Sequence, residues 1–532
     1  SEENRKIWEI KNYLDDESGN FLEIATTRPE TILGDTAVAV NPDDDRFIKY
    51  IGKNVIVPVT GKIVPVISDD YVDMEFGTGC LKITPGHDFN DYELAKKHNL
   101  EIINIFDASA RVKCDTKEYN NLDRFAARKK ILLELENSNQ LLKISDHKMI
   151  IPRGDRSHSI IEPLMTDQWY VKIKPLADEA IKCVKEKEIK FVPENWEKTY
   201  FEWMNNIQDW CISRQLWWGH RIPAWYDEEK NIYVGKNEKS VREKYDIKDD
   251  VLLTQDEDVL DTWFSSSLWP FSTLGWPNET ERVKTFYPTS VLITGFDIIF
   301  FWVARMIMMG KKFVGEVPFK EIYVHGLVKD SSGNKMSKSK GNIIDPIDLI
   351  DGIGLEELIN KRASDLMQPE MAEKIKKNTK KDYPGGIGAY GTDALRFTFA
   401  SLASNGRDIN FDLKRVEGYR NFCNKLWNAA RFVKMQGQIS IDQADTNNFQ
   451  DEDIWIRNKL AILIEDTKNN YKNYRFDYAA RSLYSFIWQD YCSWYIEIKK
   501  SKLNKKNITS LEKNLMIHNL REILKNILLL LH

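Results

Sequence analysis

The stretch VLITGFDIIFFWVARMIMMG, residues 291–310, predicts a strand, a turn and a helix in that order. A run of this length could also cross a membrane. Asp297 and Arg305 lie inside it, however, and the sequence on both sides is that of a soluble protein, which favours a buried helix. A second strand, KEIYVHGLV at 320–328, follows, and a lysine-rich loop comes next. This order of strand, loop and helix indicates a doubly wound α/β domain.

Two other kinds of sequence flank this region. Up to about residue 110 the chain reads mostly as strands: KIWEIKNYL and FLEIATT surround the turn DDESGN, and NVIVPVTGKIVPVI gives two apolar runs around Thr60–Gly61. From residue 415 onward helical periodicity dominates and predicts an antiparallel helix bundle. One apolar arc comprises Tyr419, Phe422, Leu426, Ala430 and Val433, and a second comprises Phe476, Ala480, Leu483, Ile487, Tyr491, Trp494 and Ile498.

The composition is that of a large globular protein. The chain has 532 residues, of which 42% are hydrophobic and 30% charged, with a formal net charge of −5 that argues against a wholly basic nucleic-acid binder. Its six cysteines form no C-x-x-C pair, so we expect neither structural zinc nor a disulfide framework. We expect a cytoplasmic protein that does not enter a membrane.

The lysine-rich loop, GNKMSKSKGN at 333–342, concentrates positive charge between glycines. It could be a solvated basic loop or a localisation signal. It could also be a phosphate clamp, because lysine carries a compact charge on a flexible stem and can follow a phosphate whose charge grows in a transition state. The spacing of a P-loop is absent.

The sequence KMSKS at 335–339 is the second signature of class I aminoacyl-tRNA synthetases, and the rest of the chain resembles the valyl, isoleucyl and leucyl branch of that family. The segments that carry the resemblance are ATTRPET (25–31), FGTGCLKITPGHDFNDYE (76–93), DWCISRQLWWGHRIPAWY (209–226), DVLDTWFSSSLWPFSTLGWP (258–277), GNKMSKSKGNIIDP (333–346), GTDALRF (391–397) and GRDINFD (406–412). The chain looks most like the valyl members.

The first signature of the family, H-x-G-H, is absent, because no two of the eight histidines are three residues apart. The chain also begins without methionine and ends within a helical pattern. We therefore expect a fragment that starts at the editing insertion and lacks the first half of the nucleotide fold, and we expect that it cannot activate an amino acid by itself.

The resemblance implies a multidomain α/β protein with a β-rich editing domain, the second half of a Rossmann-like catalytic domain and an α-helical anticodon-binding bundle. We expect the editing domain with its return linker at 1–195, the catalytic half with the KMSKS loop at 196–345, a connecting region at 346–414 and the bundle at 415–532.

The resemblance also implies an activity. The parent protein would activate valine with ATP and Mg²⁺, transfer it to tRNA(Val), and hydrolyse mischarged threonyl-tRNA; we expect a monomer. Two alternatives stay open: an isoleucyl enzyme, which differs in the size of the amino-acid pocket, and a non-catalytic tRNA-binding paralogue.

In the catalytic half, the resemblance assigns charge neutralisation on the triphosphate to Lys335 and Lys338. It places other residues along the nucleotide: Gly295, Asp297, His325, Gly326, Met336 and Ser337. Asp297 could instead cap the following helix. Trp218 and Trp263 resemble the walls of the amino-acid pocket, although either could belong to the ordinary core.

In the first domain, the resemblance assigns a hydrolytic pocket to Thr26, Thr27, Arg28, Phe76, Lys82, Thr84 and Asp91. Asp91 would pair with the substrate ammonium, and a bound water would attack the ester. The chain shows no Ser-His-Asp or Cys-His arrangement there. His87, Asp88 and Asp91 could in principle hold a metal, but we expect none.

The segment 414–434 is strongly basic, with six cations against the single acid Glu417. A solvated helix face would explain this. Within the family such a helix faces the anticodon arm, where phosphate contacts make binding salt-dependent. The six are Lys414, Arg415, Arg420, Lys425, Arg431 and Lys434.

Overall fold

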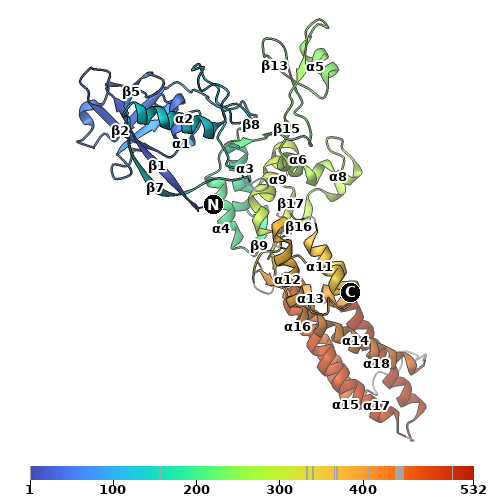
Figure 1. Ribbon diagram of the computed structural model, residues 1–532. Coiled ribbons are helices and arrows are strands. Elements are labelled where there is room, and N and C mark those ends of the chain that lie inside the picture. Colours follow the sequence, from blue (N-terminus) through green and yellow to red (C-terminus); the bar gives the residue numbers. More distant parts are fainter. Residues whose placement is uncertain are drawn as a thin grey trace. The chain divides into compact units, whose positions relative to one another are not determined.

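In a computed structural model the chain divides into two compact units, Ser1–Asp167 and Gln168–His532 (Figure 1). The structure describes residues 2–532 apart from 155–158, 331–332, 338–340, 365, 367–368, 405, 407, 438–448 and 506. The prediction for Lys338 lies outside the described residues. Within the described part, no helix combines the length and apolar character needed to span a bilayer.

Three strands form the first sheet of the first unit. Strand β1 (Glu2–Tyr13) pairs antiparallel with both β2 (Phe21–Thr26) and β7 (Leu141–Ile150). Tyr13 lies opposite Phe21 where the β1–β2 hairpin closes, so the hairpin predicted around DDESGN is confirmed.

The second sheet has four strands in the order β4–β5–β3–β6. The antiparallel pairing of β4 with β5 confirms the two runs predicted around Thr60–Gly61, and β3 lies parallel to β5 and antiparallel to β6. The strands are β3 (Ala37–Val40), β4 (Asn54–Ile56), β5 (Ile63–Ser68) and β6 (Cys80–Ile83).

The described residues of this unit also form two α-helices and two short 3₁₀ helices. Helix α2 (Arg124–Asn137) buries Ala127, Ile131 and Leu135, which share one face at helical spacing and join the core that the sheets form. The other helices are η1 (Pro29–Gly34), η2 (Ile48–Tyr50) and α1 (Phe89–His98).

The second unit contains a parallel sheet in the order β16–β17–β9, made of β9 (Lys190–Val192), β16 (Thr289–Gly295) and β17 (Phe319–His325). After β16 the chain forms a 3₁₀ turn η3 (Phe296–Ile298), a π-helix η4 (Ile299–Ala304) and α9 (Arg305–Phe313). The strand, turn and helix predicted over 291–310 are therefore confirmed.

The second unit contains many further short helices and strands. Helix α3 lies in the core of the second unit through Ala177, Ala180 and Val184. The helices are α3 (Lys174–Lys185), α4 (Trp196–Asn205), α5 (Glu238–Tyr245), α6 (Thr262–Ser267), α7 (Trp269–Ser272), α8 (Glu281–Phe286), α10 (Pro346–Asp351), α11 (Leu355–Ala363), η6 (Pro369–Met371), α12 (Ala372–Asp382) and α13 (Thr392–Leu402). The strands are β8 (Tyr170–Val171), β10 (Trp210–Cys211), β11 (Ser213–Arg214), β12 (Ala224–Tyr226), β13 (Ile232–Val234), β14 (Thr254–Gln255), β15 (Val259–Leu260), β18 (Val328–Lys329) and β19 (Ile409–Asn410).

A helix bundle forms the rest of the second unit, as the periodicity predicts (Figure 1). On α14 the first predicted arc is confirmed: Phe422 and Val433 are buried, and Tyr419, Leu426 and Ala430 pack against them. The helices are α14 (Leu413–Met435), α15 (Asp451–Lys472), α16 (Phe476–Ser485), the π-helix η8 (Phe486–Tyr495), α17 (Ile496–Leu503) and α18 (Ser510–Leu531).

The second predicted arc is wrong in its last turns. Trp494 is 63% exposed, whereas Tyr495 and Lys499 are fully buried. The reason is the π-helix η8, whose hydrogen bonds join residues five apart instead of four. This wider turn moves the buried face one residue along the chain compared with an ideal α-helix.

Lys499 is the centre of a buried polar network in the bundle. Its ammonium donates to Glu452 Oε1 at 2.9 Å and to Asp453 Oδ2 at 2.8 Å. Asp453 Oδ1 also accepts from Tyr495 at 2.5 Å and from Asn519 at 2.9 Å. The network therefore joins α15, η8, α17 and α18 through groups that are all hydrogen-bonded.

Replacing Lys499 should destabilise the bundle. Lys499→Met leaves Asp453 buried without its cation, which should lower the free energy of unfolding by ~3–5 kcal/mol. Urea denaturation followed by circular dichroism measures the change. Lys500→Met is the matched control, because the Lys500 side chain is 41% exposed and makes only surface contacts among the described residues, an ion pair with Glu497 and an approach of 5.1 Å to the centre of the Phe432 ring, so it should cost less than ~1 kcal/mol. Equal effects of the two variants would contradict the prediction.

Candidate active sites

A cavity of about 330 Å³ opens in the first unit, and all seven residues predicted for the hydrolytic pocket line it. They come from the end of β2 and the residues after it, from β6, from the start of α1 and from the segment before β6. The complete lining is Ile7, Ala25, Thr26, Thr27, Arg28, Thr31, Tyr71, Phe76, Leu81, Lys82, Thr84, His87, Asp88, Asn90, Asp91, His147 and Met149.

Lys82 forms the buried side of this cavity. Its ammonium donates to Thr31 Oγ1 at 2.8 Å, to Asp35 Oδ1 at 2.9 Å and to the hydroxyl of Thr84. Thr84 in turn donates to Asp35 Oδ1 at 2.6 Å. An ammonium has three protons, so the cluster satisfies all of them with protein acceptors.

Asp91 lies in the first turn of α1, which Asp88 caps by accepting hydrogen bonds from the backbone N–H groups of Asn90 and Asp91. Asp91 Oδ2 accepts from the backbone N–H of Thr84 at 2.8 Å. Burial raises the pKa of Asp91 to about 6, although the charge of Lys82 opposes that shift. The carboxylate is thus held in a position to meet a cation entering the cavity.

Two contacts hold the Arg28 guanidinium in place. Its guanidinium donates to the backbone carbonyl of His87 at 2.8 Å and forms an ion pair with Glu162. Phe76, in contrast, is 65% exposed, and its ring meets the edge of the His147 ring with centroids 6.4 Å apart. The cavity therefore combines polar groups with apolar side chains such as Leu81 and Met149, and Phe76 adds an exposed aromatic ring.

Sequence reasoning did not assign six other polar residues to this cavity, namely Thr31, Tyr71, His87, Asp88, Asn90 and His147. Thr31 belongs to the same ATTRPET segment, and Asp88 stands three residues before Asp91, so both could have been found from the motifs already quoted. His87 does not have a free nitrogen for a metal, because Nε2 accepts from the Ile105 N–H and Nδ1 lies 3.3 Å from the Pro163 carbonyl oxygen. Among the described residues, no three potential ligands are grouped as a metal site requires.

In the second unit, the ends of two parallel strands bring together residues predicted for the nucleotide site. Gly295 ends β16 directly beside His325 at the end of β17. A Cβ on Gly295 would lie 2.7 Å from Asp297 Oδ1, so a side chain at this position would displace the Asp297 carboxylate. Asp297 Oδ2 lies 3.7 Å from the ammonium of Lys335, and Asp297 accepts no helix-capping hydrogen bond, so the capping alternative is not supported.

The described part of the lysine loop is tied to its surroundings. The Ser337 N–H donates to Asn342 Oδ1 at 2.9 Å, and Asn342 donates to Asp330 at 2.9 Å. Met336 packs against the apolar cluster that contains Leu349 and Leu395. Gly326 follows His325, whose Nδ1 lies 2.9 Å from the Gly326 carbonyl oxygen.

The two tryptophans predicted for the amino-acid pocket differ in environment. Trp218 is 89% exposed, whereas Trp263 packs against the apolar core, with its ring stacked near Phe301. Trp263 therefore has the core contacts that the alternative interpretation expects. The pocket-wall role of both residues stays a prediction.

Comparison with known families decides the assignment. The family model for class I tRNA synthetases (I, L, M and V) matches residues 13–412, and the model for the anticodon-binding domain of tRNA ligases matches residues 453–532. The chain belongs to the class I tRNA synthetases. The parallel strand ends and the KMSKS loop are thus part of a synthetase catalytic fold.

Within the class I synthetases, the chain is similar to valine–tRNA ligases. It is 56% identical to the enzyme of Legionella pneumophila strain Paris over 534 residues, which is 100% of this chain and 58% of the relative. It is 54% identical to that of Coxiella burnetii over 99% of this chain and 57% of the relative. The chain thus spans somewhat more than half the length of these relatives.

Solved synthetase structures are more distant. Methionyl-tRNA synthetase of Mycobacterium tuberculosis bound by methionyl-adenylate is 15% identical, with a TM-score of 0.47 over 74% of this chain and 61% of that one. The assignment to the family therefore depends on the sequence comparisons.

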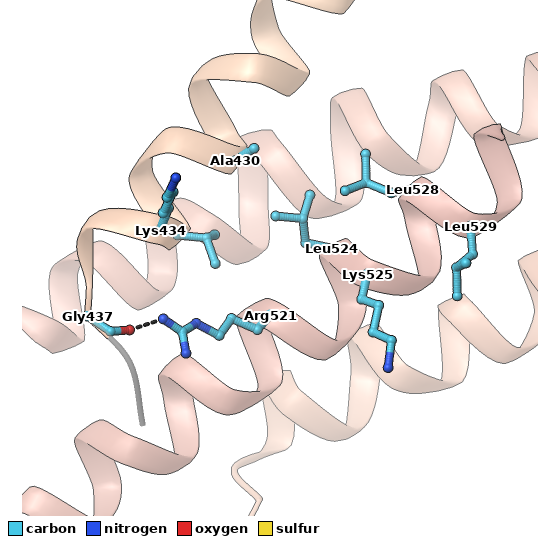
Figure 2. A pocket seen from close by; sticks show the side chains of 9 residues that line it. Ala430, Lys434, Gly437, Arg521, Leu524, Lys525, Leu528 and Leu529 are labelled. Carbon is cyan, nitrogen blue, oxygen red and sulfur yellow. Dashed lines mark hydrogen bonds between the residues drawn. The ribbon is translucent and has the colours of Figure 1, made fainter. Parts of the chain in front are cut away.

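The helix bundle of this chain carries a second cavity, of about 740 Å³, between the end of α14 and α18 (Figure 2). Three cations, Lys434, Arg521 and Lys525, stand among leucines that line it. The Arg521 guanidinium donates to the carbonyl of Gly437. Of the six basic residues predicted on 414–434, five are exposed, and Lys425 lies partly buried with its ammonium 3.9 Å from the centre of the Trp488 ring.

The environment of Asp91 predicts an unusual titration. Because burial favours the neutral acid, the Asp91 carboxyl should titrate near pH 6, so that it is mostly ionised at pH 7 and mostly protonated at pH 5. NMR of ¹³C-labelled aspartate carboxyls measures the midpoint, and Asp91→Asn assigns the signal. Lys82→Met should raise the midpoint, whereas Lys97→Met, which removes an exposed lysine, should not. A midpoint near pH 4 in the unmutated chain would contradict the prediction.

Proposed function

We propose that this chain is the editing, KMSKS-bearing and tRNA-binding part of a valine–tRNA ligase. The observation that carries the proposal is the 54–56% identity to valine–tRNA ligases across the whole chain. The enzyme activates valine with ATP, transfers the valyl group to tRNA(Val), and hydrolyses threonyl-tRNA formed in error. A panel of amino acids in ATP–pyrophosphate exchange by the full-length protein tests the specificity, and exchange that prefers isoleucine, or none at all, would contradict it.

On the activation side, the residues of this chain bind and orient the nucleotide. Gly295 lets the adenosine approach the strand ends, and Asp297 is placed to accept hydrogen bonds from the ribose. Lys335 and Lys338 neutralise the triphosphate while the valine carboxylate attacks the α-phosphorus and pyrophosphate leaves. Mg²⁺ supplies further charge neutralisation and accompanies the triphosphate.

On the editing side, the 330 Å³ cavity binds the amino acid of a mischarged tRNA. Asp91 pairs with the ammonium of this amino acid, and the threonine hydroxyls of the cavity form hydrogen bonds with the polar groups of the same amino acid. Water then adds to the ester carbonyl, the bond to the ribose oxygen breaks, and threonine and free tRNA are released. The cavity is needed because a pocket for valine rejects threonine by only ~10²-fold, for which the valyl enzyme is itself the standard example.

The exposed cations of α14 contact the phosphates of the tRNA. Five of them face solvent along one helix, which suits a surface that tracks a nucleic-acid backbone. Binding through such contacts weakens as salt concentration rises.

Loss of the KMSKS lysine should slow activation. In the full-length protein, Lys338→Ala should lower the rate constant of valyl-adenylate formation by ~10²–10³ and leave valine affinity nearly unchanged, because the charge acts mainly in the transition state. Single-turnover kinetics measure both quantities. Lys376→Ala, an exposed lysine paired with Glu373, is the control. A rate close to that of the unmutated enzyme would exclude the role.

Loss of Asp91 should abolish editing. Asp91→Ala should reduce deacylation of threonyl-tRNA by the 532-residue chain by ~10²-fold or more, because the substrate ammonium loses its partner. Deacylation of threonyl- and valyl-tRNA is measured for both proteins, with circular dichroism as the folding control. Asp70→Ala, on the nearby surface, should have no effect. The assignment fails if Asp91→Ala clears threonyl-tRNA at the unmutated rate, or if the unmutated chain hydrolyses valyl-tRNA equally fast.

A further inference from the structure

Asp35 lies behind the wall of the editing cavity and does not line it. It follows the 3₁₀ helix η1, and its side chain is only 2% exposed. Its Oδ1 accepts from the Lys82 ammonium at 2.9 Å and from the Thr84 hydroxyl at 2.6 Å. Both of these donors do line the cavity, so Asp35 can act on a bound substrate only through them.

Lys82 and its three hydrogen-bond partners form a cluster whose protons decide which atoms can bond to a molecule in the cavity. The three protons of Lys82 go to Thr31, Asp35 and Thr84. Thr84 gives its only hydroxyl proton to Asp35, and Thr31 gives its own to the Arg28 carbonyl at 2.9 Å. Each hydroxyl oxygen accepts once, from Lys82, and keeps one further lone pair. The hydroxyl oxygens of Thr31 and Thr84 can therefore accept a hydrogen bond from a molecule in the cavity but cannot donate one, because both of their protons are already used.

We propose that Asp35 is a positioning residue that sets this polarity: by holding the Thr84 proton, it makes the Thr84 oxygen an acceptor, so that the cavity selects aminoacyl esters whose side chain donates a hydrogen bond. The proposal rests on the editing function proposed above and deepens it. The hydroxyl of threonine is such a donor. Valine has a methyl group there, which would leave the buried oxygen unpaired, and this penalty disfavours valyl esters.

Removing the Asp35 carboxylate should erase the preference of the cavity for threonyl-tRNA over valyl-tRNA. In Asp35→Ala the Thr84 proton is released and can turn toward the cavity. The ratio of threonyl-tRNA to valyl-tRNA deacylation by the 532-residue chain should then fall about tenfold or more. The ratio is an internal measure, because loss of folded protein lowers both rates together. Asp44→Ala removes a buried carboxylate that pairs with Arg46, does not line the cavity and does not contact Lys82 or Thr84, so it should leave the ratio unchanged.

A conservative variant separates the acceptor oxygen from the negative charge. Asp35→Asn keeps an oxygen that can accept from Lys82 and Thr84, so this variant should retain most of the ratio of threonyl-tRNA to valyl-tRNA deacylation. If Asp35 acted only through its negative charge, Asp35→Asn would lower the ratio as much as Asp35→Ala. Thr84→Val removes the acceptor itself and should lower the ratio as much as Asp35→Ala does. The double variant should lower it no further, because the two residues act through one hydrogen bond.

Each result has a definite meaning. An unchanged ratio in Asp35→Ala, or an equal loss in Asp35→Asn and Asp35→Ala, would overturn the role of Asp35 while the editing function stands. If Asp35→Ala does not fold, a retained ratio in Thr84→Val would overturn the proposal and a lost ratio would support it. An unmutated chain without activity on threonyl-tRNA would overturn the proposed function and this inference with it.

Discussion

A lysine ammonium that is taken out of water needs hydrogen-bond acceptors for its protons, and each unit of this chain contains a buried lysine with such partners. In the first unit Lys82 lies on β6 and bonds to Thr31 of η1, to Asp35 directly after η1 and to Thr84 directly after β6. In the second, Lys499 joins α15 to α17. Elements far apart in the sequence are held together because neither charge can stay buried if one of its partners is lost.

The two buried lysines differ in that Lys82 itself lines a cavity, whereas Lys499 lies among the helices of the bundle. The acceptors of Lys499 are carboxylates of α15, so this network helps to specify the packing of the bundle. Around Lys82 two of the acceptors are hydroxyls that also face the cavity. Because the protons of Lys82, Thr31 and Thr84 are already used in hydrogen bonds, the hydroxyl oxygens of Thr31 and Thr84 can only accept from a substrate. This is the basis of the preference that we propose for side chains that donate a hydrogen bond.

The nucleotide side depends on a different constraint, the parallel alignment of β16 with β17. Parallel strands end at the same edge of a sheet, so Gly295 and His325 must lie side by side. The missing side chain of Gly295 leaves room for Asp297, which is free of any capping bond and meets Lys335 from the KMSKS loop. Local backbone geometry thus brings a loop lysine to the strand ends.

The sequence by itself determined many of the elements and seven of the residues that line the cavity of the first unit. Period-two and period-3.6 patterns were sufficient for the hairpin, the strand–turn–helix at 291–310 and the first bundle arc, because those segments follow regular backbone geometry. The seven residues predicted for the hydrolytic pocket came from motifs of the family, and the fold brings all of them to one cavity. Only the tertiary structure decided that Tyr495 and Lys499 are buried and Trp494 is exposed, because a π-helix arises from packing and shifts the helical period. Only the tertiary structure placed Asp35 against Lys82 and Thr84, because a contact between residues 47 and 49 positions apart has no local pattern from which it could be read.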